Sequence, residues 1–531
     1  MAVKVARGGT DRLPLYHQFA MSISRREFLR GAAASFVTAP VVTHAQVDDG
    51  STQLFRHGVA SGDPMGDRVV LWTRLTEPST RSAMGPIDVE WQVSTDEQVT
   101  RLVAQGSVIA RPDRDFTVKV DAAGLEPGRS YFYAFSAGGQ RSPIGRTRTL
   151  AARGAGRVRL AVVSCSNYGT GYFNVYRCLS NRDDLDAVLH LGDYIYESAN
   201  GSYGTGPEGG RIAQREAHDV TLADYRQRYA AYRSDIDLQA AHARHPFVAV
   251  WDDHELTDNA WSDGAEGHDP RDGNWKRRQA AAYQAYLEWM PVRESTQSGI
   301  RLYRSFRFGD MADVIVLDTR AFRDRQLAPE SVARMDRGDR SVLGDTQERW
   351  LFDRLRASNR DDTRWRLIGQ QIMFSQLNAP GALPNPDFWE GYPAARRRIL
   401  EFLDEQRVAN VAILAGDVHS SWAFDVPRNP WSGAPADSRS LAIELVAPAI
   451  SSAPLFSEPG VRERMMALRA RSPHLKFLEG DSNGYVLLEL TRERLLADWY
   501  FVATTARRSG EESKAASFVC ESGTARLTPS G

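Results

Sequence analysis

The chain has 531 residues, which is too long for one ordinary hydrophobic core, so two or three domains are expected. Its 66 basic and 67 acidic residues give a net charge of −1. This balance excludes a chain-wide positive field that would attract nucleic acid or an anionic membrane, and no nucleic-acid-binding surface is evident. The three cysteines allow at most one disulfide and leave at least one thiol over.

Residues 1–45 have the composition of an export signal. The pair Arg25-Arg26 is followed by Phe-Leu and by the apolar, small-residue run 31–43, which ends at a small-x-small cleavage motif. This order marks a twin-arginine signal, and Met21 is a second candidate start because the residues before it have no signal character. We expect export by the twin-arginine machinery to the periplasm or the medium; an amphipathic helix with incidental arginines is the alternative. No apolar run is long enough for a transmembrane segment.

Residues 52–150 alternate short β-forming segments with turns, which is typical of a β-sandwich of immunoglobulin or fibronectin type. The expected strands are 68–73, 89–93, 116–120 and 130–136. The run from Leu125 to Tyr133 resembles the corner before a fibronectin-type strand with a buried tyrosine. We expect this all-β domain to pack beside the next one, and a binding role is the alternative.

Residues 157–505 alternate strands and helices after a linker at 151–156, which predicts an α/β domain with mixed sheets. The expected strands are 158–164, 186–191, 247–251, 314–318, 365–369, 411–414 and 441–447. The expected helices lie near 173–181, 222–241, 275–289 and 394–406. Residues 485–490 and 495–501 have the pattern of an antiparallel pair, and 506–531 is expected to be a C-terminal tail.

Four of the expected strands end at side chains that bind metals. The runs 158–164, 187–191, 247–251 and 411–414 are continuously apolar, as in strands buried on both faces. In sheets of that kind, ligands collect on the loops that follow the strand ends. These loops offer a thiol, a phenol, imidazoles and carboxylates, so they predict a metal centre and a metalloenzyme.

Asp193 and Tyr196 follow the second of these strands. An aspartate after a glycine turn can bridge two cations, and a tyrosine binds only a strongly Lewis-acidic ion because its phenol must first ionise. A turn aspartate beside a buried tyrosine hydroxyl is the alternative.

After the third strand, Asp252 and Asp253 offer carboxylates for hard cations, and His254 offers proton transfer. A helix N-cap cluster, which uses similar residues, is the alternative.

Asp417 and His419 follow the fourth strand, and side chains two apart on an extended segment share a face, so both can touch one metal or two adjacent ones. A histidine satisfied without a metal is the alternative. Cys165 ends the first strand and suits a soft donor to iron better than the nucleophile of a Cys–His pair. Asn259 offers another oxygen, and Arg320 could grip a phosphate oxygen or make only ion pairs. No Gly-x-Ser-x-Gly elbow or phosphate-binding glycine loop is present, which excludes serine hydrolases and P-loop enzymes.

Taken in order, these motifs resemble the alkaline phosphatase D (PhoD-like) family of calcineurin-like metallophosphoesterases. The resemblance covers nearly the whole mature chain. Its motifs are the run from Phe55 to Pro64, Ser164-Cys165-Ser166, HLGDYIYE ending at Glu197, WDDHE ending at Glu255, LDTR ending at Arg320, the segment from Asp387 to Tyr392 and GDVHSSW ending at Trp422. It implies an α/β (α+β) four-layer metallophosphoesterase sandwich behind the N-terminal all-β domain.

The resemblance also implies Fe3+ and Ca2+ as cofactors. The implied metal ligands are Cys165, Tyr196 and His419 on the iron side, Asp253 and Asp417 on the calcium side, and Asp193 between the two ions. His254 matches the catalytic histidine that stabilises the transition state. Asn259 and Arg320 are the candidates for substrate binding.

The family implies a secreted alkaline phosphatase or phosphodiesterase, which hydrolyses phosphate mono- or diesters, or both, by a metal-bound hydroxide. His254 would neutralise phosphoryl charge and protonate the leaving alkoxide. The expected substrate is a small-molecule or lipid phosphate ester. Two alternatives stay open: a phospholipase D-type phosphodiesterase that uses the same site, and a non-catalytic surface-binding protein built on a degenerate scaffold.

Overall fold

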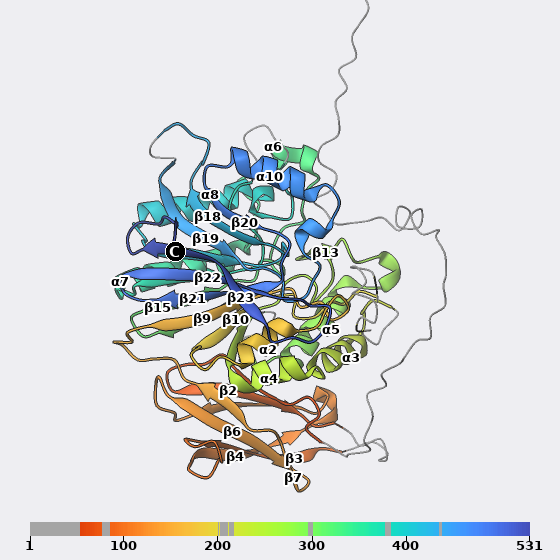
Figure 1. The fold of residues 1–531 in the computed structure, drawn as a ribbon. Helices are drawn as coiled ribbons and strands as arrows, with labels where there is room; N and C mark the ends of the chain where they lie inside the picture. The colour runs from red at the N-terminus through yellow and green to blue at the C-terminus, as the bar shows by residue number, and fades with distance from the viewer. Residues whose placement is uncertain are drawn as a thin grey trace, which may run out of the picture.

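The computed structural model describes residues 54–76, 85–199, 201, 211, 217–295, 301–377, 384–434 and 438–530. The expected export signal at 1–45 lies outside these residues. Figure 1 shows a β-rich N-terminal region, in orange, below two larger layered sheets with helices around them. Among the described residues, no helix is both long and apolar enough to cross a membrane.

The N-terminal region forms a β-sandwich. One sheet holds five strands, which are β3 (Ile87–Ser94), β4 (Leu102–Ala110), β6 (Ser130–Ala137), β7 (Gln140–Arg141) and β8 (Gly145–Arg148). The facing strands are β1 (Val59–Gly62), β2 (Arg68–Arg74) and β5 (Thr117–Ala123). Alternate residues of both layers share one apolar core, in which Leu71 joins Val89 and Phe135. The predicted all-β layer pair is therefore present.

This sandwich is continuous with the rest of the molecule. Strand β1 pairs in parallel with β11 (Pro246–Ala249), so β1, β2 and β5 extend a ten-stranded sheet. The sheet order is β24-β23-β22-β21-β9-β10-β11-β1-β2-β5. Backbone hydrogen bonds between β1 and β11 therefore cross the predicted boundary near residue 150. Strand β1 covers the edge of β11, which would otherwise be exposed.

The centre of the ten-stranded sheet is parallel. It consists of β9 (Val158–Val163), β10 (Ala187–His190) and β11, and it continues antiparallel through β21 (Gly484–Leu490) and β22 (Arg494–Val502). The segment after residue 505, which we expected to be a tail, instead contains β23 (Glu512–Glu521) and β24 (Thr528–Pro529). Strand β23 pairs with β22 along its whole length, so these residues are part of the same sheet.

A second, seven-stranded mixed sheet faces the first. Its strands, in spatial order, are β14 (Arg304–Phe308), β15 (Ala312–Val316), β16 (Trp365–Gly369), β17 (Val411–Ala415), β19 (Ser440–Val446), β18 (Ser421–Pro427) and β20 (Leu475–Glu479). On β15, Val314 belongs to the core between the sheets and Ile315 to the core on the opposite face. Both faces are buried, which explains the continuous apolar runs.

Helices cover the outer face of each sheet. On β10, Leu189 lies toward Gly369 of the second sheet, whereas the adjacent His190 bonds to Tyr176 of a helix. The helices over the first sheet are α2 (Asn174–Ser180), α3 (Leu222–Arg233), α4 (Ile236–Arg244) and α5 (Trp275–Trp289). Those over the second are α7 (Gly344–Arg360), α8 (Pro393–Glu405) and α10 (Val461–Arg471).

Short elements complete the chain. They are α6 (Val332–Met335), β12 (Ala260–Trp261), β13 (Gly264–Ala265) and the single 3-10 turns η1 (Pro112–Arg114), η2 (Pro270–Asp272), η3 (Pro329–Ser331), η4 (Trp389–Gly391) and η5 (Leu455–Ser457). The three cysteines are free and buried, so the disulfide that their number allowed does not form.

Candidate metal centre

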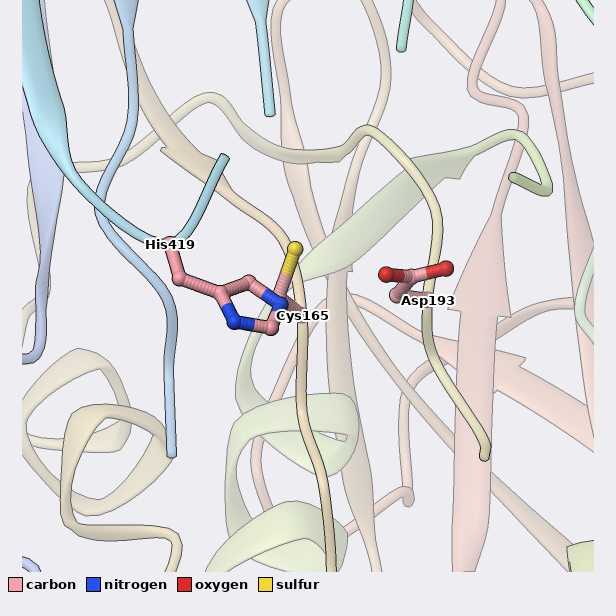
Figure 2. Close-up of side chains that lie close together, drawn as sticks. All are labelled: Cys165, Asp193 and His419. Carbon is pink, nitrogen blue, oxygen red and sulfur yellow. The ribbon is translucent and has the colours of Figure 1, made fainter. Parts of the chain in front are cut away.

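The loops after β9, β10, β11 and β17 meet between the two sheets. They bring together five of the six predicted metal-binding residues, which form three overlapping groups with Asp252 and His254. Figure 2 shows that Cys165, Asp193 and His419 reach one place from separate segments. Each group has its ligand atoms within 4.8 Å of one another: Cys165, Asp193 and His419; Asp193, Asp253 and His254; Asp252, Asp253 and Asp417.

The backbone at these strand ends is unusual. Cys165, Asp193, Asp417 and His419 all adopt positive φ angles, between 52° and 65°. Non-glycine residues rarely occupy the left-handed region, and such residues cluster at functional sites where the surrounding structure holds them. At Gly192, a Cβ atom would lie 2.5 Å from the backbone nitrogen of Asp252, so only glycine lets the two ligand loops approach.

Tyr196 joins the first group through its hydroxyl. This oxygen donates to Asp193 Oδ2 at 3.0 Å, lies 2.9 Å from His419 Nε2 and accepts from Ser452 Oγ at 2.8 Å. The Nδ1–H of His419 donates to the Ala453 carbonyl at 3.1 Å, which leaves Nε2 without a proton. Burial lowers the pKa of His419 to about 4, so its imidazole is neutral, the form that binds metals.

The second side of the centre consists of carboxylates. Asp193 and Asp253 each belong to two of the three groups. The Oδ1 atom of Asp253 is buried and accepts no hydrogen bond from the described part of the chain. Sequence reasoning placed Asp252 in the right motif but did not select it as a ligand, although its carboxylate lies in the third group.

The carboxylates repel one another without a cation. Burial, followed by the charges of neighbouring carboxylates, raises the pKa of Asp417 well above its usual range, and burial has the same effect on Asp193. Burial also raises the pKa of Asp252 to about 6. An orphaned buried carboxylate oxygen, a neutral imidazole and crowded acids form a donor set that fits metal ions.

Arg320 is the counter-charge for this set. Its guanidinium lies 2.9 Å from Asp387 Oδ1, 3.0 Å from Asp417 Oδ1 and 3.7 Å from Asp253 Oδ1, and it also bonds to Asp252. The side chain is fully buried, and it is not among the described residues that line the cavity. The structure therefore places Arg320 behind the carboxylates, where we had expected a group that grips the substrate.

His254 is oriented by a carboxylate that sequence reasoning quoted without giving it a role. Its Nδ1–H donates to Glu197 Oε2 at 2.8 Å, and its ring stacks on Tyr196 with centroids 4.2 Å apart. Burial lowers the pKa of His254, but Glu197, Asp253 and Asp193 together raise it well above its usual value. The imidazole is therefore charged near neutral pH. Glu197 ends the HLGDYIYE motif, so the signal was present in the sequence.

Glu255 ties two ligand loops together. Its carboxylate accepts the backbone N–H groups of Asp193 at 3.0 Å, Tyr194 at 2.8 Å and Asp252 at 2.9 Å. Ser452, which follows β19 of the other sheet, donates its hydroxyl to the Tyr196 hydroxyl. Both were missed as functional residues, and the signal for Ser452 was a fifth strand end. Their bonds restrict how far the ligands can move.

The cavity above these ligands includes Asn259, as expected for a substrate contact. Its backbone N–H donates to Asp253 Oδ2 at 2.6 Å, and its side-chain amide donates to Glu266 at 3.0 Å.

The thiol of Cys165 does not resemble a nucleophile, because burial and the charge of Asp193 raise its pKa well above its usual value. Catalytic cysteines have a lowered pKa instead.

Comparisons with known proteins agree with this geometry. The family model of the PhoD-like phosphatase matches residues 160–499, and that of the PhoD-like phosphatase N-terminal domain matches residues 42–151. Alkaline phosphatase D of Bacillus subtilis (strain 168) is 36% identical over 524 residues, which cover 94% of this chain and 88% of that protein.

A solved structure of PhoD superposes with a TM-score of 0.80 at 35% identity, and the match covers 90% of this chain and 92% of that one. The mixed sheets and helices described above are therefore those of a PhoD fold. With an alkaline phosphatase D as its homologue, the chain is a hydrolase of phosphate esters. It belongs to the PhoD-like phosphatase family.

Proposed function

We propose that this phosphoesterase depends on two adjacent metal positions. Cys165, Tyr196 and His419 would hold the first, Asp253 and Asp417 the second, and Asp193 would bridge them. The observation that carries the proposal is the overlap of the three ligand groups, which share Asp193 and Asp253. A carboxylate common to two groups is what two neighbouring cations require.

We propose Fe3+ for the first position and Ca2+ for the second. A phenol with a pKa raised by burial, as at Tyr196, binds as phenolate only to a strongly Lewis-acidic ion, and a thiolate suits iron better than calcium. The second position offers carboxylate oxygens, including Asp252, which are the ligands that Ca2+ prefers.

In this proposal bound cations lower the pKa of an attacking water and neutralise charge on the phosphoryl oxygens. His254 is the catalytic residue on the chain itself. Its charged imidazole donates a proton to the leaving alkoxide, while Glu197 keeps Nδ1 occupied and the ring fixed. Asn259 stays a predicted substrate contact, and Arg320 is assigned to holding the carboxylates.

The chemistry serves phosphate monoesters and diesters alike, and a phospholipase D-type diesterase remains the second candidate. It is favoured by the apolar part of the cavity lining, where Phe388, Val418 and Leu455 could meet a lipid chain. The clustering of five predicted ligands, with the Tyr196 hydroxyl beside Asp193 and His419, supports an enzyme over a degenerate surface-binding scaffold.

We further propose a four-layer arrangement of helices, two sheets and helices, which the two separate cores support. Export by the twin-arginine machinery, from the signal expected at 1–45, is proposed on sequence alone. It predicts a secreted or periplasmic enzyme, and replacing Arg25 and Arg26 with lysines should retain the unprocessed protein in the cytoplasm. Normal export of that variant would exclude this route.

Elemental analysis combined with a visible absorption spectrum tests the metal proposal. We expect iron and calcium, with a broad visible band that disappears in Tyr196→Phe. The matched control is Tyr194→Phe, since the Tyr194 hydroxyl lies 2.9 Å from His242 Nε2 and outside the ligand groups, so the band should survive. A colourless protein with two zinc ions would exclude Fe3+, and a metal-free active protein would overturn the proposal.

Substrate type is tested with 4-nitrophenyl phosphate and its bis ester. A kcat/KM higher for the monoester by about 10-fold would identify a phosphomonoesterase, since such a difference equals about 1.4 kcal/mol of transition-state binding. The reverse preference, together with cleavage of phosphatidylcholine, would favour the phospholipase D-type candidate.

A further inference from the structure

One wall of the cavity is built by the segment 452–464, which links the seven-stranded sheet to α10. Its start is fixed directly on the metal ligands. Ser452 Oγ lies 2.8 Å from the Tyr196 hydroxyl and 2.9 Å from the Cys165 carbonyl, and Leu455 N–H donates to the His419 carbonyl at 3.1 Å. Residues that follow in this segment are therefore held at a set position relative to the reacting centre.

The same wall changes chemical character as it leaves the metal ligands. Pro454, Leu455 and Val461 line the cavity, so the wall next to the acidic floor is apolar. Val461 and Arg464 are three residues apart on the first turns of α10, which places both on one face of the helix, and both line the cavity. Arg464 is the only arginine or lysine in the described lining.

The guanidinium of Arg464 is not committed to a partner within the described part of the chain. It makes no hydrogen bond or ion pair there, in contrast to Arg320 and Arg323, which are buried against carboxylates. Glu458 also lines the cavity, and the charge of Arg464 favours its ionised form without a direct bond between the two side chains. A half-buried, unengaged guanidinium is a favourable partner for an anionic group.

We propose that Arg464 is a specificity-determining residue, which binds a second anionic group on the organic part of the phosphate ester. The apolar wall would contact the body of that organic part, and the guanidinium would bind a carboxylate or a second phosphate at its far end. This inference rests on the proposed function, because the metal centre must hold the scissile phosphate at the other end of the cavity.

Three 4-nitrophenyl phosphodiesters test the inference. They share one leaving group and one alkyl chain, and the chain ends in a methyl group, a carboxylate or a phosphonate. The metal-loaded wild-type enzyme should prefer either anionic end over the methyl end by about 10-fold in kcat/KM, mainly through KM. The larger preference identifies a carboxylate or a phosphate-like group as the natural partner.

Arg464→Gln should remove this preference and leave the rate with the methyl-ended diester within about twofold. Arg464→Lys should keep part of it, because the charge remains and the planar fork is lost. The matched control is Arg469→Gln, which changes the charge of α10 equally at an exposed residue outside the lining and should keep the full preference. Equal kcat/KM values in the wild type, or a preference that survives Arg464→Gln, would overturn the inference.

Binding measured without turnover separates this inference from the proposed function. Alkylphosphonates with the same three far ends cannot be hydrolysed at the phosphorus–carbon bond, and calorimetry gives their dissociation constants with the metal-loaded protein. An anionic end should tighten binding about 10-fold in the wild type and not in Arg464→Gln. If neither these diesters nor 4-nitrophenyl phosphate is hydrolysed, the proposed function fails, and the phosphonates still support or overturn the role of Arg464.

Discussion

The two sides of the metal centre are held by different physical means. On the Tyr196 side, mostly neutral groups hold one another through hydrogen bonds to His419 and Ser452. On the Asp253 side, several carboxylates repel one another, and the Arg320 guanidinium keeps them together. The Tyr196 side is preorganised by hydrogen-bond geometry, whereas the Asp253 side depends on the balance of charge. A single substitution should therefore affect the two sides unequally.

Removing metal should have the largest effect because it acts on both sides at once. After chelation and dialysis, we expect turnover of 4-nitrophenyl phosphate to fall about 1000-fold, since metal ions supply several kcal/mol of transition-state stabilisation. Steady-state rates before and after metal is restored give the measurement. If elemental analysis shows that the protein is free of metal and its turnover is unchanged, both sides would be dispensable as metal positions.

The metal-free protein should also respond to pH through its carboxylate side. Burial raises the pKa of Asp193 and Asp417 above the usual 3.8, and that of Asp252 to about 6. These groups hold protons more tightly in the folded chain than in the unfolded one, so the free energy of unfolding falls as pH rises through this window. Urea unfolding at about pH 5 and about pH 8 checks this sign, and the metal-loaded protein should change less.

Arg320→Gln breaks the charge balance of the carboxylate side alone. We expect a loss of about 3 kcal/mol or more in the free energy of unfolding, because one buried partner of several ion pairs is removed. Calcium affinity should change as well, while the visible band of the Tyr196 side stays in place. Arg320→Lys should recover part of the stability, since it keeps the charge. A shifted band with unchanged stability would reverse the assignment of the two sides.

His254→Ala removes the side chain that we propose as proton donor. We expect turnover to fall roughly 100-fold or more, at full metal content, because preorganised groups of this kind supply a few kcal/mol in the transition state. The measurement is kcat together with elemental analysis of the same sample. Near-normal turnover would remove the catalytic role of His254, and Glu197→Gln should have a smaller effect of the same sign.

Ser452→Ala should have the smallest effect of these changes, and it tests the Tyr196 side alone. It removes the hydroxyl that bonds to the Tyr196 hydroxyl and to the Cys165 carbonyl, for which we expect about 1 kcal/mol less stability and a shift in the visible band. The matched control is Ser451→Ala, which deletes a bond to the Asn167 carbonyl of similar length and leaves Tyr196 untouched. A band that shifts equally in both variants would show that the first side is not held by Ser452.

Much of the site followed from sequence because strand ends were recognisable. Continuous apolar runs predicted the strands that carry Cys165, Asp193, Asp253 and Asp417, and the structure confirms those strands as β9, β10, β11 and β17. Parallel strands place their carboxyl ends at one edge, which brings the loops after β9, β10 and β11 together, whereas Asp417 reaches them from the second sheet. The role of Arg320 as a counter-charge could not be predicted from the sequence. Its partners lie on three other loops, and no local sequence pattern shows that these loops come close to Arg320.

The sequence by itself determined which segments of the α/β core are strands, which side chains follow their ends and which family the chain resembles, because short-range periodicity and motif order are properties of the chain. Only the tertiary structure decided that β1 extends the ten-stranded sheet, that the segment after residue 505 forms its far edge and that Arg320 faces inward. These features depend on strand pairing and ion pairs between residues that are distant in sequence. Such contacts form only when the helices and strands pack together, so no local sequence pattern specifies them.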